Sequence, residues 1–143
     1  MKFKVALIGF GYWGPKLARN IQNSNYFQID YIIDKSNKNI ECAKKSFPLS
    51  KVVSDYKKVD LVVISTPTKT HFQMASFFLK YTNVLVEKPL SLSVRQVNRL
   101  ESLTKKFKNK LFVDYPFIFS GSIKIIKNII EKKKYGKLLE IES

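Results

Sequence analysis

The chain opens with a short apolar segment that leads directly into a glycine-rich loop. Val5–Ile8 is apolar throughout, as expected for a strand buried on both faces of a parallel sheet. The next residues, Gly9–Gly14, have the spacing Gly-x-Gly-x-x-Gly, and Pro15 then suits the first turn of a helix. A strand, a glycine loop and a helix in this order predict the first unit of a doubly wound α/β fold.

The rest of the chain continues this alternation with short connections. Apolar segments bounded by turn residues predict strands at Lys4–Gly9, Phe27–Ile33, Lys51–Val53, Asp60–Ser65, Asn83–Glu87 and Leu111–Asp114. Apolar residues at helical spacing predict helices from Pro15 to about Asn25, over Asn37–Ser46, Thr70–Tyr81 and Ser93–Lys106, and from Ser122 to about Tyr135, with Gly136 as the C-cap. We therefore predict an α/β protein with one doubly wound parallel sheet and helices on both of its faces.

The composition fits one domain of ordinary size. With 143 residues, 45% of them hydrophobic, the chain is neither a disordered tail nor a low-complexity linker. It has no run of 18 apolar residues and no signal-peptide pattern, so we expect no membrane partner. A single cysteine, Cys42, and a single histidine, His71, exclude an internal disulfide and a metal site built from several Cys or His residues. We expect a cytoplasmic protein without a metal.

The net charge of +15 raises the question of nucleic-acid binding. The chain has 23 Lys but only 3 Arg, and Arg is the residue that most often contacts base edges through two hydrogen bonds. The lysines are scattered along the chain, and the clusters Lys105–Lys110 and Lys132–Lys137 fall at predicted helix C-termini, where the helix dipole favours cations. We expect no specific nucleic-acid partner, although the positive field should favour anionic small molecules.

The glycine loop has the spacing that binds a dinucleotide in strand–loop–helix units of this kind. Gly9 permits the tight turn, Gly11 lets the backbone approach a pyrophosphate, and Gly14 lets the helix pack closely on the strand. The free N–H groups at the start of the helix supply the anion site. We predict a dinucleotide at this loop; a glycine-rich turn without a ligand is the alternative.

Three bulky residues of the loop, Phe10, Tyr12 and Trp13, belong to the predicted cofactor site. Tyr12 and Trp13 have two interpretations. They either line the cofactor cleft or shield the first helix from solvent.

An acidic residue, Asp34, follows the second predicted strand, 20 residues beyond Gly14. At this position a carboxylate accepts hydrogen bonds from the ribose hydroxyls of the adenosine half and repels a 2′-phosphate. We therefore predict NAD as the cofactor, with NADP less favoured, although the adjacent Lys35 could soften the preference. The alternative is that Asp34 is only a turn or helix N-cap residue.

Two further motifs follow the fourth and fifth predicted strands. Ser65-Thr66-Pro67 ends the fourth strand, with His71 just beyond, and Glu87-Lys88-Pro89 ends the fifth. With these motifs and its glycine loop, the chain resembles the N-terminal half of the Gfo/Idh/MocA oxidoreductases. The form Gly-Tyr-Trp-Gly-Pro of the loop, Val113–Phe117 and the pair Ser120-Gly121 are similar to the branch of that family that acts on nucleotide sugars and surface polysaccharides.

The resemblance implies roles for these motifs. It makes Lys88 the catalytic lysine, near the nicotinamide and the reacting hydroxyl, where an ammonium can hydrogen-bond and polarise an oxygen. It also makes Lys88 part of the cofactor site, together with Ser65, Thr66, Pro67, His71 and Glu87. Pro89 shapes the turn, and a cis Lys88–Pro89 bond is compatible with it. The alternatives are an exposed lysine that ends a strand and a histidine satisfied by backbone groups.

The resemblance also implies a second α/β domain that holds the substrate and part of the catalytic apparatus, and we expect that domain to be absent from this chain. We expect residues 1–136 to form the dinucleotide-binding Rossmann domain and residues 137–143 to be the first strand of the second domain. The family's later catalytic Asp and His have no counterpart, since His71 is the only histidine. An unpaired strand at 137–143 would leave a monomer or a weak homodimer formed through it.

Three functions remain open from the sequence. The first is the NAD-binding domain of a dehydrogenase that oxidises a sugar or nucleotide sugar by hydride transfer and is catalytically complete only with its second domain. The second is a dinucleotide-binding module without catalysis. The third is a basic interaction domain.

Overall fold

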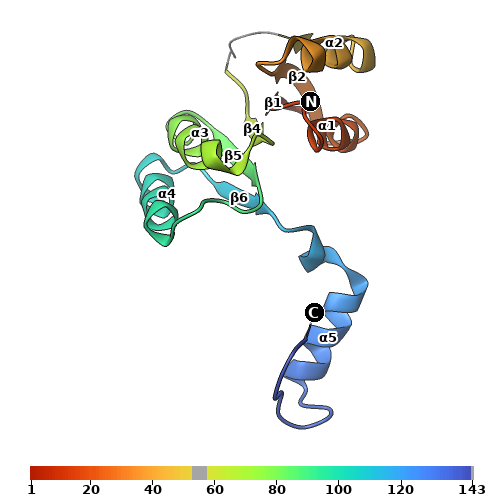
Figure 1. Cartoon of the computed structure of the whole chain (residues 1–143), viewed down its shortest axis with the longest axis vertical. Coiled ribbons are helices and arrows are strands. Elements are labelled where there is room, and N and C mark those ends of the chain that lie inside the picture. Colours follow the sequence, from red (N-terminus) through yellow and green to blue (C-terminus); the bar gives the residue numbers. More distant parts are fainter. Residues whose placement is uncertain (53–57, 143) are drawn as a thin grey trace.

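One parallel sheet of six strands, in the order β3-β2-β1-β4-β5-β6, organises the chain (Figure 1). The computed structural model describes residues 1–52 and 58–142. The strands are β1 (Phe3–Ile8), β2 (Phe27–Ile33), β3 (Lys51–Val52), β4 (Leu61–Ile64), β5 (Asn83–Glu87) and β6 (Leu111–Asp114). All six predicted strands are present within a residue or two at each end; Val53, predicted in the third, lies outside the described residues. The predicted α/β fold with a doubly wound parallel sheet is confirmed.

The two innermost strands, β1 and β4, are buried on both faces, which explains the apolar residues at Val5–Ile8 and Leu61–Ile64. Alternate residues of β1 enter different cores: Ala6 and Ile8 one, Val5 and Leu7 the other. All four have exposed fractions of 5% or less. In these two segments the side chains on both faces therefore need to be apolar.

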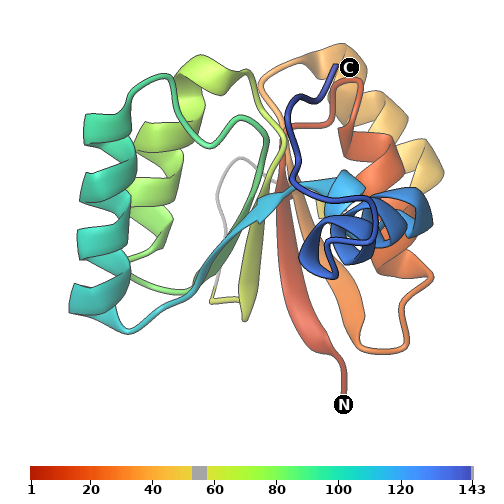
Figure 2. The same cartoon turned by 90° about the horizontal axis from the view of Figure 1, so that it is seen from below.

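Helices cover the two faces in pairs. On one face lie α1 (Gly14–Gln22) and α2 (Asn37–Ser46), and on the other α3 (His71–Phe78) and α4 (Val94–Phe107). Figure 2 shows the sheet between them, with α1 and α2 on one side and α3 and α4 on the other. The connections after β1, β2, β4 and β5 each run from the carboxyl end of a strand to the start of a helix, so these four loops meet at one edge of the parallel sheet.

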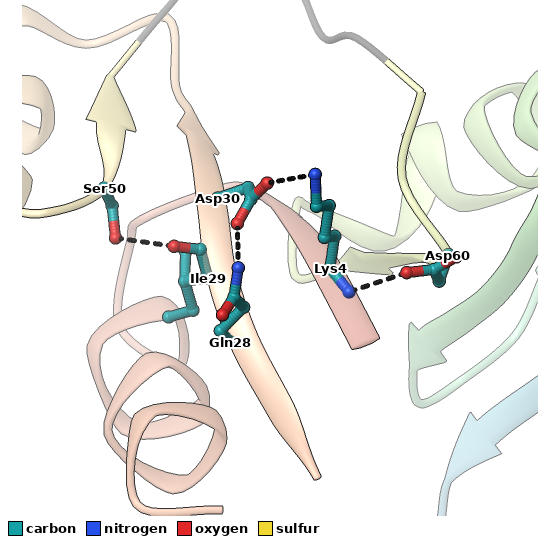
Figure 3. A network of polar contacts seen from close by, with 6 residues as sticks. All are labelled: Lys4, Gln28, Ile29, Asp30, Ser50 and Asp60. Carbon is teal, nitrogen blue, oxygen red and sulfur yellow. Dashed lines mark hydrogen bonds and ion pairs between the residues drawn. The ribbon is translucent and has the colours of Figure 1, made fainter. Parts of the chain in front are cut away.

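A polar network ties three segments together near the opposite edge of the sheet (Figure 3). The Lys4 N–H donates to Asp60 Oδ2 at 2.8 Å, and the Asp60 N–H donates to the Lys4 carbonyl at 2.9 Å, so β1 and the residue before β4 are joined reciprocally. Asp30 sits at the point where the register between β1 and β2 shifts. Its carboxylate accepts from Gln28 Nε2 at 2.8 Å and lies 3.9 Å from Lys4 Nζ.

The C-terminal part of the chain differs most from the prediction. The last helix, α5, spans Gly121–Glu131 and ends before Tyr135, because Lys133 adopts a left-handed φ of 48°. Every residue of α5 is at least partly exposed, and the helix projects away from the sheet (Figure 1). A short 3₁₀ turn, η2 (Pro116–Phe119), precedes it and was not predicted. Residues 138–142 have strand-forming residues but no secondary structure in the described chain.

The predicted helix Thr70–Tyr81 is also shorter than expected. Its first turn is a separate 3₁₀ segment, η1 (Thr68–Thr70), and α3 ends at Phe78. The 3₁₀ geometry follows from the hydrogen bonds of the Thr-Pro-Thr segment, in which both the backbone N–H and the hydroxyl of Thr70 donate to the Pro67 carbonyl.

Candidate functional site

A cavity of about 450 Å³ lies at the carboxyl edge of the sheet. Its walls come from the ends of β1, β2 and β4, so it opens where the strand order reverses between β1 and β4. In open α/β sheets this is the position where ligands bind. Six residues singled out from the sequence line it: Gly9, Gly11, Asp34, Ser65, Thr66 and Pro67.

The fold requires glycine at two of the three glycine positions of the loop but not at the third. A Cβ at Gly9, whose φ is 93°, would lie 2.7 Å from the Ser65 carbonyl oxygen, and a Cβ at Gly14 would lie 2.5 Å from the Gly9 carbonyl oxygen. Both positions therefore need glycine for the fold itself. At Gly11, by contrast, an added Cβ would have no heavy atom of the described residues within 4 Å. The fold does not require glycine at this cavity-lining position.

The backbone N–H groups of the loop divide into two sets. Those of Gly9 and Phe10 are already bonded within the protein, to the Ile33 carbonyl at 2.8 Å and to Asp34 Oδ2 at 2.6 Å. Those of Gly11, Tyr12 and Trp13 have no hydrogen-bond partner among residues 1–52 and 58–142. They precede α1, where unpaired N–H groups and the helix dipole favour an anion.

The bulky loop residues lie outside the cavity. Phe10 is buried, with an exposed fraction of 2%, and its ring packs edge-on against Phe47 in the core. Tyr12 and Trp13 are exposed and contact each other edge-on, with the Lys16 ammonium 3.8 Å and 4.2 Å from their ring centroids. Their aromatic faces hold this lysine at the first turn of α1.

Asp34 is a structural residue of the loop as well as a lining residue of the cavity. Its Oδ2 accepts from the Phe10 N–H and, at 3.1 Å, from Asn39 Nδ2, while its Oδ1 accepts from the Ser36 N–H at 2.7 Å. A carboxylate offers about four acceptor positions, so roughly one remains for a ligand hydroxyl. The turn role left open by the sequence is therefore present.

The residues after β4 close the cavity on its other side. The Ser65 hydroxyl donates to the Gly9 carbonyl at 2.7 Å and so ties β4 to the glycine loop. The hydroxyls of Thr66 and Thr70 are 2.7 Å apart, and Thr66, Pro67 and Thr70 all line the cavity. His71 follows but does not line it. With an exposed fraction of 1%, the ring lies behind this wall, its nitrogens 2.7 Å from the Thr66 carbonyl oxygen and 2.8 Å from that of Pro89.

The Glu87-Lys88-Pro89 turn lies at the end of β5, next to β4. Lys88 is exposed, and the Lys88–Pro89 peptide bond is cis, as the sequence allowed. Glu87 is buried and pairs in register with Asp114 of β6. Burial raises the pKa of the Glu87 carboxyl, and the nearby Asp114 carboxylate raises it further, partly offset by the backbone N–H and the charge of Lys88. The Glu87 carboxyl beside Lys88 therefore holds a proton more readily than an ordinary glutamate does.

Sequence reasoning missed several residues of the cavity wall. Asn39, on α2, bonds the Asp34 carboxylate, and Met74, on α3, accepts a weak hydrogen bond from the Thr66 hydroxyl. Ile8, Ile33, Lys35 and Thr70 complete the lining residues that were not selected. Ile8 and Ile33 could have been predicted, because they end two neighbouring strands and ligands bind beyond the carboxyl ends of strands at a switch point. Nothing in the local sequence marks Asn39 or Met74.

Residues 3–115 match the family described as "Oxidoreductase family, NAD-binding Rossmann fold", Gfo/Idh/MocA. The chain belongs to this family. It is the NAD-binding Rossmann domain of a Gfo/Idh/MocA oxidoreductase, as the glycine loop and the Glu-Lys-Pro turn predicted.

Curated relatives resemble the chain over nearly its whole length. The uncharacterised oxidoreductase YdgJ of Escherichia coli K12 is 27% identical over 147 residues, which cover 98% of this chain and 42% of that protein. A myo-inositol 2-dehydrogenase of Thermotoga maritima is 27% identical over 141 residues, covering 94% of this chain and 42% of that protein. The chain thus spans about two fifths of the length of the curated relatives it matches.

Solved structures share the fold. The myo-inositol 2-dehydrogenase of Lactobacillus plantarum superposes with a TM-score of 0.87 at 22% identity, covering 97% of this chain and 44% of that one. The scyllo-inositol dehydrogenase of Lactobacillus casei, solved with bound NAD(H) and scyllo-inositol, gives a TM-score of 0.86 at 21% identity, covering 95% and 43%.

Two features are absent from the described residues. No helix in residues 1–52 and 58–142 has the length and apolar character needed to cross a bilayer. The same residues contain no group of three or more His, Cys, Asp or Glu side chains arranged to hold a metal ion.

Proposed function

We propose that the cavity at the ends of β1, β2 and β4 binds NAD(H), in preference to NADP(H). The glycine loop would bind the pyrophosphate through the N–H groups of Gly11, Tyr12 and Trp13, which are unpaired among the described residues. Asp34 would accept a hydrogen bond from the adenosine ribose at the opposite wall. The net charge of +15 favours an anionic ligand in general.

The observation that carries this proposal is the open space at Gly11. The fold explains glycine at positions 9 and 14, because a side chain there would collide with backbone. It does not explain glycine at position 11, which lines the cavity and where an added Cβ would have no heavy atom of the described residues within 4 Å apart from its two chain neighbours. A ligand whose phosphates must approach the backbone closely supplies the missing reason.

The preference for NAD rests on charge. The Asp34 carboxylate lines the cavity where a 2′-phosphate of NADP would lie, and like charges at short distance repel. Lys35 also lines the cavity and offsets part of this repulsion. Because Lys35 is exposed while the carboxylate is fixed by three hydrogen bonds, we expect the carboxylate to dominate.

We further propose that the whole protein is a dehydrogenase of a secondary hydroxyl on a cyclic polyol, sugar or nucleotide sugar. In this reaction the carbinol carbon gives a hydride to NAD⁺ and the hydroxyl gives up a proton, leaving a ketone. Lys88 is the residue we assign to hydrogen-bond the reacting oxygen. The names of the inositol dehydrogenases among the relatives and structural neighbours support the substrate class. Because the chain spans two fifths of such proteins, we assign most substrate contacts to residues outside it.

The test is calorimetric titration of NADH and NADPH into the wild-type chain and the Gly11→Val variant. The wild type should bind NADH more tightly than NADPH. Gly11→Val should fold normally, because its Cβ meets no described atom, and should lose NADH binding by at least about tenfold through overlap with the pyrophosphate. Equal affinity of the wild type for both cofactors would refute the NAD preference, and unchanged binding in the variant would refute the site.

For the location of the protein we propose the cytoplasm. The single cysteine, which is exposed and has no disulfide partner in the chain, suits a reducing compartment. NAD(H) is also supplied there.

A further inference from the structure

The only histidine of the chain bridges two connections at the functional edge of the sheet. His71 is the first residue of α3, and its ring is almost completely buried. Nε2 lies 2.7 Å from the Thr66 carbonyl oxygen and Nδ1 lies 2.8 Å from the Pro89 carbonyl oxygen. One ring therefore spans from the residues after β4 to the residues after β5.

The Thr66 side of this bridge is the wall of the cavity. Thr66, Pro67 and Thr70 line it, and their hydroxyl and carbonyl groups are bonded to one another. His71 Nε2 bonds the carbonyl at the start of this wall from behind. The ring thus braces the wall on the side away from any ligand.

The Pro89 side of the bridge is the turn that carries Lys88. Within the described part of the chain, the His71–Pro89 hydrogen bond is the only one that joins residues 88–90 to another element. The Lys88 N–H bonds only the side chain of the preceding Glu87, at 3.2 Å. Leu90 packs against the apolar core, and the His71 ring adds a polar contact between this turn and α3.

The Thr66 and Pro89 carbonyl oxygens need hydrogen-bond donors, which a residue that only fills space would not supply. A neutral imidazole has one N–H and donates to one carbonyl, whereas an imidazolium donates to both. A buried carbonyl without a donor is destabilising. A histidine that only filled space would not need a carbonyl oxygen opposite each nitrogen.

We propose that His71 is a positioning residue that fixes the Lys88 turn relative to the wall of the dinucleotide cavity. It touches neither the cavity nor the reacting atoms and acts through the Thr66 and Pro89 carbonyls. The proposal extends the proposed function, because it concerns the alignment of Lys88 with a cofactor held in that cavity. In this proposal Nε2 holds the cavity wall through the Thr66 carbonyl, and Nδ1 holds the Lys88 turn through the Pro89 carbonyl.

Two substitutions test the hydrogen bonds of the two ring nitrogens separately. Counted along the side chain, the amide nitrogen of Gln reaches as far as Nε2, and that of Asn reaches as far as Nδ1. His71→Gln therefore keeps a donor for the Thr66 carbonyl, and His71→Asn keeps one for the Pro89 carbonyl. We expect the dissociation constant of NADH to stay within about twofold for His71→Gln and to rise between about threefold and tenfold for His71→Asn, the usual range for one lost hydrogen bond.

The backbone order parameter of the Leu90 amide, measured by ¹⁵N relaxation without NADH, should show the opposite ranking of the two variants. It should be lower in His71→Gln, which removes the donor to the Pro89 carbonyl and leaves the Lys88 turn unbraced, than in His71→Asn. If His71 had only a packing role, the variant that binds NADH more weakly would also show the larger change at the Leu90 amide. That result would overturn the proposal.

Thr82→Val is the matched control. Thr82 is also buried, and its hydroxyl donates to the Val59 carbonyl at 2.9 Å, but it precedes β5 at the far edge of the sheet. This variant should lose thermal stability to a degree similar to the His71 variants and leave the NADH dissociation constant unchanged. If it weakens NADH binding as much as His71→Asn does, the effect is general destabilisation and the proposal is wrong.

A ligand-free measurement protects the test against variants that fail to fold. Because the chain has one histidine, its ring ¹⁵N and N–H signals in an NMR spectrum belong to His71. We expect ring protons that exchange slowly with water; ring signals of a freely exchanging, tautomer-averaged imidazole would overturn the bridge. A further outcome is that the wild type fails to bind NADH while the ring signals and the predicted ranking of the two variants at Leu90 are both observed. In that case the proposed function fails and the positioning of the Lys88 turn by His71 stands.

Discussion

Asp34 illustrates how one residue serves the loop and the ligand together. Its carboxylate accepts the Phe10 N–H, the Ser36 N–H and an Asn39 N–H, so it holds the conformation of the glycine loop. Asp34→Ala would remove these bonds as well as any bond to a ribose. A loss of NADH affinity in that variant would therefore mix two causes, whereas Gly11→Val changes the cavity alone.

Glu87 allows a prediction about pH. Its pKa is raised in the folded protein by burial and by Asp114, so the stability it contributes is complete below the ordinary pKa of a glutamate and is lost as the pH rises through the raised value. Gln cannot ionise, so Glu87→Gln should be more stable than the wild type at neutral pH, and the two should converge in acid. Urea unfolding at a series of pH values measures this.

Glu101→Gln is the control for that series. Glu101 is exposed and its pKa is lowered by its hydrogen bond and ion pair with Lys105, so the direction is opposite. This variant should be equal to or slightly less stable than the wild type at neutral pH. A Glu87→Gln variant that is less stable than the wild type at neutral pH would contradict the assignment of a disfavoured charge.

The loops that carry the candidate site residues could be predicted from the sequence, but the contacts of those residues could not. The spacing of Gly9, Gly11 and Gly14 after an apolar strand fixes the loop type, and the carboxyl ends of parallel strands meet at one edge. The burial of Phe10 and the two bonds of the His71 ring depend on how separate segments pack, which no local pattern encodes. The same holds for Asn39, which reaches Asp34 from α2.

At the scale of elements, the strands were predictable because both faces of the sheet are buried. A continuous apolar run such as that of β4 has no other stable place in a domain of this size. The last helix was predictable only in part. Its apolar residues have helical spacing, but none of its residues is buried, so little burial energy favours extending the helix through the like charges at Lys132–Lys134.

The exposure of α5 leads to a prediction about local stability. Short isolated helices are marginal in water, and three isoleucines on α5 have exposed fractions of 42% to 62%. Backbone amides of α5 should therefore exchange with solvent orders of magnitude faster than those of β4, as hydrogen-exchange mass spectrometry would show. Equal protection of both elements in dilute solution would mean that α5 is covered by another surface.

The C-terminal residues 137–142 carry the side-chain pattern of a strand without a partner. Leu139 and Ile141 are exposed and alternate with Glu140 and Glu142, the pattern of a strand that is half buried. An unpaired segment of this kind can pair with another chain. We predict weak dimerisation of the full chain that is lost when it ends at Gly136. Sedimentation of both forms tests this, and monomers of equal stability at high concentration would contradict it.

At the scale of the whole molecule, the chain combines a complete cofactor cavity with one candidate catalytic residue. Hydride transfer requires the substrate carbon to be held close to the nicotinamide, and Lys88 alone cannot hold it. We predict that this chain does not reduce NAD⁺ at a useful rate with inositols, sugars or UDP-sugars. Robust NADH formation with any of them would show that the described residues are sufficient for catalysis.

The most direct test of the account is an NMR titration of the ¹⁵N-labelled chain with NADH. The account predicts the largest amide shifts at Gly11, Tyr12 and Trp13, with smaller ones after β2 and β4, where Asp34 and Thr66 line the cavity. Shifts confined to the lysine-rich helix ends, or none at the glycine loop, would show that NADH is attracted only by the net charge. That result would contradict the assignment of the cavity.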